Sequence, residues 1–246
     1  MDRPIRRVFM TDLDFRMGAF VVAASLVSGG CGLISSDVTN FDLTLPDKTF
    51  TIDASGWQVD ETAAAALTAT SCSQSPAVCA SAAEQACAED CTGRCGSSQT
   101  CELDLDVGLY QMIDLLREKP ELQSINDEPV IKVTVDSVTY EVTLNTLNVD
   151  TPAMEVYVAP MSVMDPGDPL AKHVGTIPSV PAGTTVLTPT TMTFTANGKA
   201  ELVNIMATFK TPFNLIVGST LTVKAGAPVP SGRLDAVVHI KGHAGL

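Results

Sequence analysis

The chain has 246 residues, and its 28 acidic and 15 basic side chains give it a net charge of −13 at pH 7. A chain of this length can bury one sizeable core with a small appendage, while its negative charge repels phosphate backbones and argues against nucleic-acid binding. Aromatic residues make up only 5% of the sequence, which leaves little material for a carbohydrate-stacking platform.

The N-terminal segment has the pattern of an export signal. After a charged stretch, an apolar run of 11 residues starts at Met17 and leads through small residues to Cys31. A membrane-spanning helix needs about 20 apolar residues, so we predict that this run is the core of a signal peptide over residues 1–30. A buried apolar helix with a chance cysteine is the alternative, and Met10 and Met17 are alternative starts to Met1.

The end of this segment resembles the signal peptide of bacterial lipoproteins. Gly29 and Gly30 match the small residues that precede the lipidated cysteine in that family, whereas Ser28 stands where the family usually carries Leu or Val. The resemblance implies cleavage before Cys31, lipid on this cysteine and, because Gly32 rather than Asp follows it, an outer-membrane or surface location. The lipid would anchor the protein to the membrane, since more than one acyl chain gives stable binding.

Removal of residues 1–30 makes the chain still more acidic. The mature protein would carry 11 basic and 25 acidic residues, a net charge of −14. Such a chain is also repelled by an anionic membrane surface. We therefore expect residues 31–40 to form a lipidated tether that holds the folded domain away from the bilayer.

Alternating apolar and polar residues predict the first strands. Residues 41–45 and 50–53 both alternate, and Pro46-Asp47 separates them. A period of two is typical of a strand with one buried face. We assign residues 41–56 to the start of a β-sandwich.

Six cysteines then follow in one cluster: Cys72, Cys79, Cys87, Cys91, Cys95 and Cys101. An even cluster in an exported protein predicts three disulfides, and the sequence does not choose among the possible pairings. Residues 63–100 have few large apolar side chains. We therefore predict a disulfide-rich, partly helical insertion over residues 57–105, with a helix starting near Ser75-Pro76. The regular spacing of the third, fourth and fifth cysteines leaves a metal site as the alternative, although no histidine is near.

Two short amphipathic helices are predicted outside the insertion. The first begins at Asp106 and ends before Pro120, with an apolar stripe at helical spacing. The second lies between Asn197-Gly198 and Pro212. The two stripes are Leu109, Met112, Ile113 and Leu116, and Leu202, Ile205, Met206 and Phe209.

Further alternating segments complete the predicted sheets, with Gly218 marking a bulge. They span residues 131–135, 138–144, 154–158, 186–194, 213–223 and 234–240. The strand count and the turn density predict a mainly β fold. We expect an antiparallel Ig-like β-sandwich made of residues 41–56 and 106–246, interrupted by the Cys-rich insertion.

No recognisable catalytic or metal-binding set occurs. His173 is placed in a polar loop, and His239 and His243 lie near the last strand with both side chains expected to face solvent. The motifs G-x-S-x-G, H-E-x-x-H and the Walker loop are missing from the sequence. Residues 102–113 begin like an EF-hand but misplace its glycine and its last ligand, and residues 165–169 read first as a turn, with a weak calcium contact as the alternative. We predict no catalytic, cofactor-binding or metal-binding residues.

These features predict a lipid-anchored protein of the cell envelope or surface whose β-sandwich binds or scaffolds a protein or an envelope polymer in adhesion or envelope assembly. The signal and the cysteine cluster resemble those of uncharacterised Cys-rich bacterial lipoproteins, a likeness that implies no activity. The alternatives are a carrier of a lipid or another apolar ligand, which needs an apolar cavity, and an envelope hydrolase, which needs polar groups with perturbed pKa values clustered in a cleft.

Overall fold

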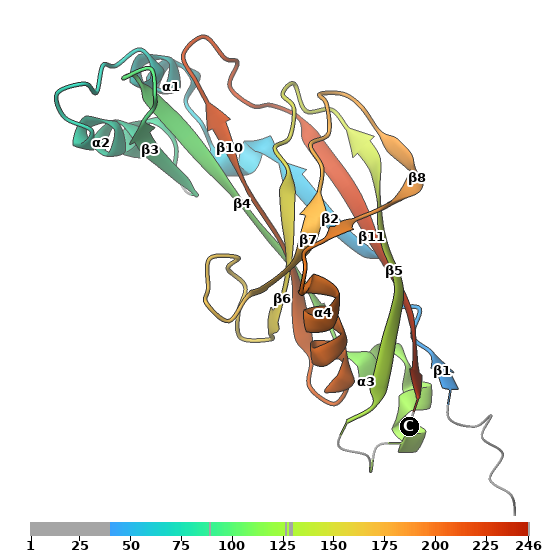
Figure 1. The fold of residues 1–246 in the computed structure, drawn as a ribbon. Helices are drawn as coiled ribbons and strands as arrows, with labels where there is room; N and C mark the ends of the chain where they lie inside the picture. The colour runs from blue at the N-terminus through green and yellow to red at the C-terminus, as the bar shows by residue number, and fades with distance from the viewer. Residues whose placement is uncertain (1–39, 89, 126, 128–129, 246) are drawn as a thin grey trace, which may run out of the picture. The chain divides into compact units, whose positions relative to one another are not determined.

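The computed structural model describes residues 40–245 except 89, 126, 128 and 129 (Figure 1). The predicted signal peptide, the lipid site Cys31 and the tether up to residue 39 lie outside the described residues. Within the described part, no helix combines the length and the apolarity needed to cross a membrane.

The described residues form two antiparallel sheets (Figure 1). The first sheet has the strand order β1 (Asn40–Asp42), β11 (Arg233–Gly245), β5 (Lys132–Asn145) and β8 (Val186–Thr191), with β2 (Lys48–Asp53) also paired to β11. The second has the order β3 (Cys91–Cys95), β4 (Cys101–Ile113), β10 (Phe213–Val223), β6 (Met154–Pro160), β7 (Lys172–Ile177) and β9 (Thr193–Phe194). The predicted mainly β, antiparallel sandwich is confirmed.

One hydrophobic core joins the inner faces of the two sheets. Strand β11 shows how alternation builds this core, because Leu234, Ala236 and Val238 are buried while the residues between them are partly exposed. A small void of about 10 Å³ remains where these three residues meet Met154 and Val217 of the second sheet. A void of this size holds at most one water molecule. The space between the sheets at this point is therefore filled by side chains.

The helix predicted over residues 106–119 is wrong. Its first half belongs to β4, which pairs with β10 from Leu103 to Ile113, and only a short helix, α3 (Leu115–Glu118), follows. Leu109 and Ile113 are four residues apart, a spacing that puts two side chains on one face of a helix and also on one face of a strand. Met112, which only the helical pattern requires to be buried, is 37% exposed.

The predicted bulge at Gly218 is also wrong. Pairing between β10 and β4 continues through Gly218, which faces Gly108 without a shift in register. A Cβ atom at Gly218 would lie 2.6 Å from Cβ of Pro166, so this glycine makes room for a proline above the sheet. Register shifts occur in the pairing of β11 with β5 instead, at Asp235/Ala236 and at Lys241/Gly242.

Other predicted strands are present with changed limits. The two segments expected over residues 131–144 form the single strand β5, and residues 186–194 are divided between β8 in the first sheet and β9 in the second. The second predicted helix is confirmed as α4 (Gly198–Ala207), which buries Leu202 and Met206 and packs against β5 and β7.

The Cys-rich stretch supplies strands to the second sheet. It contains the 3-10 turn η2 (Ala54–Trp57) at its start, helices α1 (Glu61–Thr68) and α2 (Ala77–Ala86), and then β3 and β4. A further 3-10 turn, η3 (Pro120–Ile125), follows α3. The boundary that we expected at residue 105 falls inside β4, so this stretch is continuous with the sandwich. Helix α2 packs against β3, and α1 packs against α2 and β4 (Figure 1).

Three disulfide bonds join the six clustered cysteines. They link Cys72 to Cys95, Cys79 to Cys101 and Cys87 to Cys91, with Cα–Cα distances of 5.8, 5.3 and 6.6 Å. The first two tie the loop after α1 and helix α2 to the hairpin of β3 and β4. They therefore replace the apolar contacts that this Ala- and Ser-rich stretch lacks.

Candidate functional site

A groove of about 990 Å³ lies on the face of the second sheet that points away from the core. Strands β4, β10 and β6 form its floor, and the loop between β6 and β7 forms one wall. It is lined by Asp90, Asp106, Val107, Gly108, Tyr110, Pro152, Ala153, Glu155, Tyr157, Met164, Asp165, Pro166, Gly167, Gly218, Ser219 and Thr220.

Strand alternation and register determine the floor of this groove. On β4, Val107 is buried in the core, whereas Asp106, Gly108 and Tyr110 are on the opposite face and are exposed. Gly108 lies opposite Gly218 of β10, which in turn lies opposite Glu155 of β6. Two neighbouring strands therefore present no side chain at the centre of the groove.

The wall formed by residues 161–171 is held by one buried side chain. Asn214 of β10 is 1% exposed, and its Nδ2 atom donates hydrogen bonds to the carbonyl oxygens of Met161 at 3.0 Å and Val163 at 2.8 Å. Val163 also packs on Ile216 in a small apolar cluster outside the main core. The loop is thus fixed to the outer face of the sheet.

The tip of the same loop is the turn predicted at residues 165–169. Asp165 Oδ1 accepts a hydrogen bond from the backbone N–H of Gly167 at 2.7 Å, and Asp168 Oδ1 accepts one from Leu170 at 2.7 Å. These bonds are those of Asx-turns. Asp165 and the neighbouring Met164, which is 50% exposed, face the groove.

The groove is acidic. Four of its lining side chains are carboxylates, Asp90, Asp106, Glu155 and Asp165, and none is Lys or Arg. Asp106 Oδ1 accepts a hydrogen bond from Thr220 Oγ1 at 2.9 Å, and Glu155 accepts one from Thr176 Oγ1 at 2.8 Å and contacts His173. Clustered charges of one sign attract ligands of the opposite sign.

Tyr157 lies between this acidic groove and His173. Burial, with a smaller contribution from the nearby Glu155 carboxylate, raises the pKa of the Tyr157 hydroxyl. The ring centroids of Tyr157 and His173 are 5.1 Å apart. Tyr157 is therefore a neutral hydrogen-bonding group at physiological pH.

The three histidines do not come together. His173 is on strand β7 rather than in the polar loop that we predicted, and its Nε2 lies 3.1 Å from the carbonyl oxygen of Gly175. His239 and His243 are on the outer face of the first sheet, where their Nδ1 atoms lie 2.6 Å from Asp47 Oδ1 and 3.2 Å from Asp136 Oδ2. In the described residues each ring contacts a carboxylate, and no hydrogen bond joins any of them to a serine, threonine or cysteine side chain.

The acidic run that resembled an EF-hand has a structural role at its start. Arg94 of β3 lies between Glu102 and Asp104 of β4, with N–O distances of 2.5 Å to each carboxylate. Asp104 also accepts a hydrogen bond from Thr222 at 2.6 Å. These contacts occupy the first two carboxylates of the run and leave Asp106 facing the groove.

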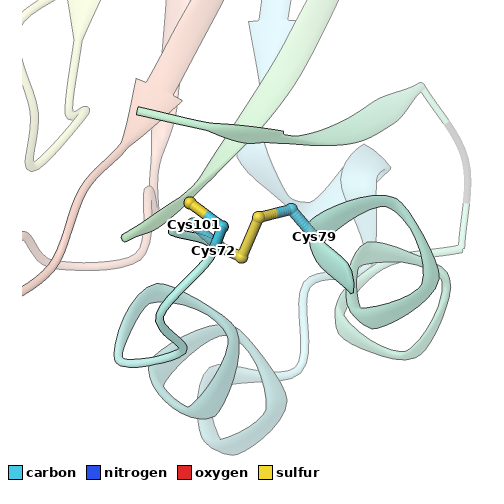
Figure 2. Close-up of side chains that lie close together, drawn as sticks. All are labelled: Cys72, Cys79 and Cys101. Carbon is cyan, nitrogen blue, oxygen red and sulfur yellow. A yellow bond between two sulfur atoms is a disulfide. The ribbon is translucent and has the colours of Figure 1, made fainter. Parts of the chain in front are cut away.

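Two of the three disulfides in the cysteine cluster pack against each other. The sulfur atoms of Cys72, Cys79 and Cys101 lie within 4.8 Å of one another (Figure 2). Cys79 and Cys101 are bonded to each other, and Cys72 is bonded to Cys95. Metal ions bind the thiolate form of cysteine. The three cysteines of the metal alternative, Cys87, Cys91 and Cys95, are also disulfide-bonded and do not offer thiolate ligands.

Sequence reasoning did not find the groove. Its floor is marked by the absence of side chains at Gly108 and Gly218, and its lining comes from segments more than one hundred positions apart.

Comparison of the chain with protein-family models, with curated proteins and with solved structures found no match.

Proposed function

We propose that this protein is a lipid-anchored component of the bacterial cell envelope whose β-sandwich binds another macromolecule without catalysis, in adhesion or envelope assembly. The observation that carries the proposal is the groove on the second sheet. Tyr110, Met112 and Met164 are 45%, 37% and 50% exposed in it or beside it. Tyrosine and methionine are enriched at protein interfaces, and grouped apolar side chains on a surface mark interaction sites.

The proposed location rests on two observations. Three disulfides indicate an exported protein, since such bonds persist in oxidising compartments. The lipid anchor on Cys31 and the outer-membrane address rest on the resemblance of residues 17–32 to lipoprotein signals. Anchoring would concentrate the groove at the membrane surface, where an envelope partner is met.

The two alternatives have less support. A carrier of an apolar ligand needs a cavity of several hundred Å³, whereas the apolar void found between the sheets is about 10 Å³. A hydrolase of the Ser–His type needs a hydroxyl next to a histidine, whereas the described histidine rings contact carboxylates. Binding through the open groove agrees with both observations.

Photo-crosslinking in cells that produce the protein tests the proposal. A photoreactive phenylalanine analogue at Tyr110 should form an adduct of discrete mass with an envelope component. The matched control is the same analogue at Leu187 of β8, which is 69% exposed on the other sheet and should form none. Equal labelling at Tyr110 and at Leu187 would count against a binding groove on the second sheet. So would the absence of any adduct when the analogue is placed at Tyr110 and, in a separate variant, at Met164.

A further inference from the structure

Strand β4 has an edge beside the groove with which no described strand pairs beyond Leu105. The first sheet meets β4 here through a side chain, since Gln111 Nε2 donates a hydrogen bond to the carbonyl oxygen of Thr49 in β2 at 2.9 Å. Strand β3 pairs with β4 only from Cys101 to Leu105, whereas β10 covers the opposite edge of β4 as far as Ile113. Immediately before β3 begins, the chain bends at Asp90, whose φ angle is +52°.

Two contacts show which backbone groups of β4 face this edge. The N–H group of Asp106 donates to the carbonyl oxygen of Asp90 at 2.7 Å, and the carbonyl oxygen of Asp106 accepts from the indole of Trp57 at 2.9 Å. In an antiparallel strand, alternate residues direct both backbone groups to the same neighbour. The N–H and C=O groups of Gly108, Tyr110 and Met112 therefore point to this edge.

The edge of the first sheet at β8 differs from the β4 edge because a proline protects it. That strand contains Pro189, which lacks an N–H group, and it is largely exposed and threonine-rich. Proline on an edge strand prevents the addition of a further strand. Residues 108–112 have no proline, and two of their outward side chains, Tyr110 and Met112, are large and partly apolar.

We propose that an extended segment of a partner protein adds to β4 as a strand opposite Gly108–Met112, with a Lys or Arg side chain lying over Gly108 in the groove. This inference rests on the proposed binding function and names the chemistry of the partner. An added strand lies about 4.8 Å from β4, and Gly108 has no side chain to block the path from it into the groove. A cation placed there meets Asp106 and Asp165 and lies beside the ring of Tyr110, which favours a positive charge.

The same charges disfavour a second copy of this chain as the occupant. Pairing two β4 edges would bring the carboxylates of Asp90 and Asp106 of both copies together. Each mature chain would carry a net charge of −14, and like charges brought together at an interface disfavour association. A basic partner strand meets no such repulsion.

Peptide binding to the purified, lipidated protein in detergent tests the inference. The probe is a fluorescent eight-residue peptide that alternates Lys with Val and Thr. The first control peptide replaces Lys by Glu, and the second keeps every Lys but replaces the other residues by Pro, which removes N–H groups at equal charge. We expect the Kd of each control to be at least about tenfold weaker, a loss of about 1.4 kcal/mol.

Matched variants locate the site. Asp90→Asn, Asp106→Asn and Asp165→Asn together keep each side-chain oxygen acceptor, and asparagine tolerates the left-handed backbone at position 90. The triple variant should weaken binding of the Lys peptide at least about tenfold. A control triple with the same charge change, Asp60→Asn, Asp136→Asn and Asp150→Asn, lies outside the groove and should change binding less than about twofold.

A variant that fills the floor tests the geometry separately from the charge. A Cβ atom at Gly108 would meet nothing nearer than Pro166 Cδ at 3.8 Å, an ordinary contact. Gly108→Val should therefore fold, with the higher strand preference of valine, and still lose binding of the Lys peptide. Hydrogen exchange should show protection of the amides of Gly108, Tyr110 and Met112 when the peptide binds to the wild-type protein.

Each remaining outcome contradicts a defined part of the inference. Equal binding of the Lys/Val and Lys/Pro peptides would show surface electrostatics without strand addition. Binding unaffected by the Asn triple would exclude the groove, and a dimer in light scattering that the peptide dissociates would make a second copy the occupant. If crosslinking at Tyr110 captures a partner and the Asn triple variant captures it equally, the proposed function is supported and this inference is wrong. If neither crosslinking nor peptide binding is observed, both the proposed function and this inference are wrong.

Discussion

Replacement of Asn214 by alanine should loosen the wall of the groove at a measurable cost in stability. The side chain is 1% exposed and donates two hydrogen bonds, at 3.0 and 2.8 Å, to the carbonyl oxygens of Met161 and Val163. A hydrogen bond contributes about 1 kcal/mol net, and a buried acceptor left without a partner costs about 1–3 kcal/mol. We therefore expect Asn214→Ala to lower the free energy of unfolding by about 2–3 kcal/mol, a large part of the usual total of about 5–15 kcal/mol.

Asn148 provides a matched control. Its side chain also makes two hydrogen bonds to the backbone, donating to Val229 at 2.9 Å and accepting from Ser231 at 2.7 Å, but it is exposed. Water can replace those bonds, so Asn148→Ala should cost less than about 1 kcal/mol. Guanidinium unfolding of both variants with the disulfides intact measures the two values.

Hydrogen exchange distinguishes a local effect from a global one. In Asn214→Ala, the amides of residues 161–171 should exchange faster than in the wild type, while those of β10 stay protected. Equal stability losses in the two variants, or unchanged exchange in residues 161–171, would refute the conclusion that Asn214 holds this wall in place.

Three further predictions concern the anchor, the disulfides and acid stability. Cys31→Ala should release the protein from the membrane fraction or leave it unprocessed, and an uncleaved wild-type N-terminus without lipid on Cys31 would contradict the proposed anchor. Replacing both Cys79 and Cys101 by serine removes a bond across 22 residues and should lower the free energy of unfolding by about 3 kcal/mol, whereas a loss below about 1 kcal/mol would show that this bond adds little. The Arg233 guanidinium, hydrogen-bonded at 2.8 Å, holds the pKa of Asp235 below its usual value, so the stability it provides is present above the unfolded pKa and is lost as the pH falls through the folded pKa. Arg233→Met should therefore begin acid unfolding at a higher pH than the wild type in circular dichroism, and an unchanged midpoint would contradict this coupling.

Much of the fold could be predicted from local periodicity. The last strand alternates buried and partly exposed residues without a break from Leu234 to Ile240, so its pattern could be read directly. β4 could not, because Leu109 and Ile113 fit both a helix and a strand, and only its pairing with β10 decides between them. The division of residues 186–194 between two sheets likewise depends on long-range pairing that a local pattern does not contain.

The candidate site was less accessible to sequence reasoning than the fold. The sequence predicts a bulge at Gly218, whereas the role of this glycine depends on Pro166, which lies 52 positions earlier in the chain. The Asp165 turn was predicted, but its place above the sheet depends on Asn214, whose partners lie 53 and 51 positions away. A site formed by outer-face residues has no hydrophobic pattern to reveal it, because such patterns report burial in the core.

An exposed strand edge is a liability in a secreted protein, since it offers the same unpaired groups to every other chain. The Trp57 indole and the turn at Asp90 limit this edge on β4 to a few residues. Under the proposed strand addition, the carboxylates of Asp90 and Asp106 would repel a second copy of the same acidic chain. Under the proposed function these carboxylates also select a basic segment, so one set of charges would both prevent self-association and recognise the partner. This dual use predicts that their neutralisation weakens peptide binding and increases dimerisation in the same variant, and light scattering of the Asn triple measures the second effect.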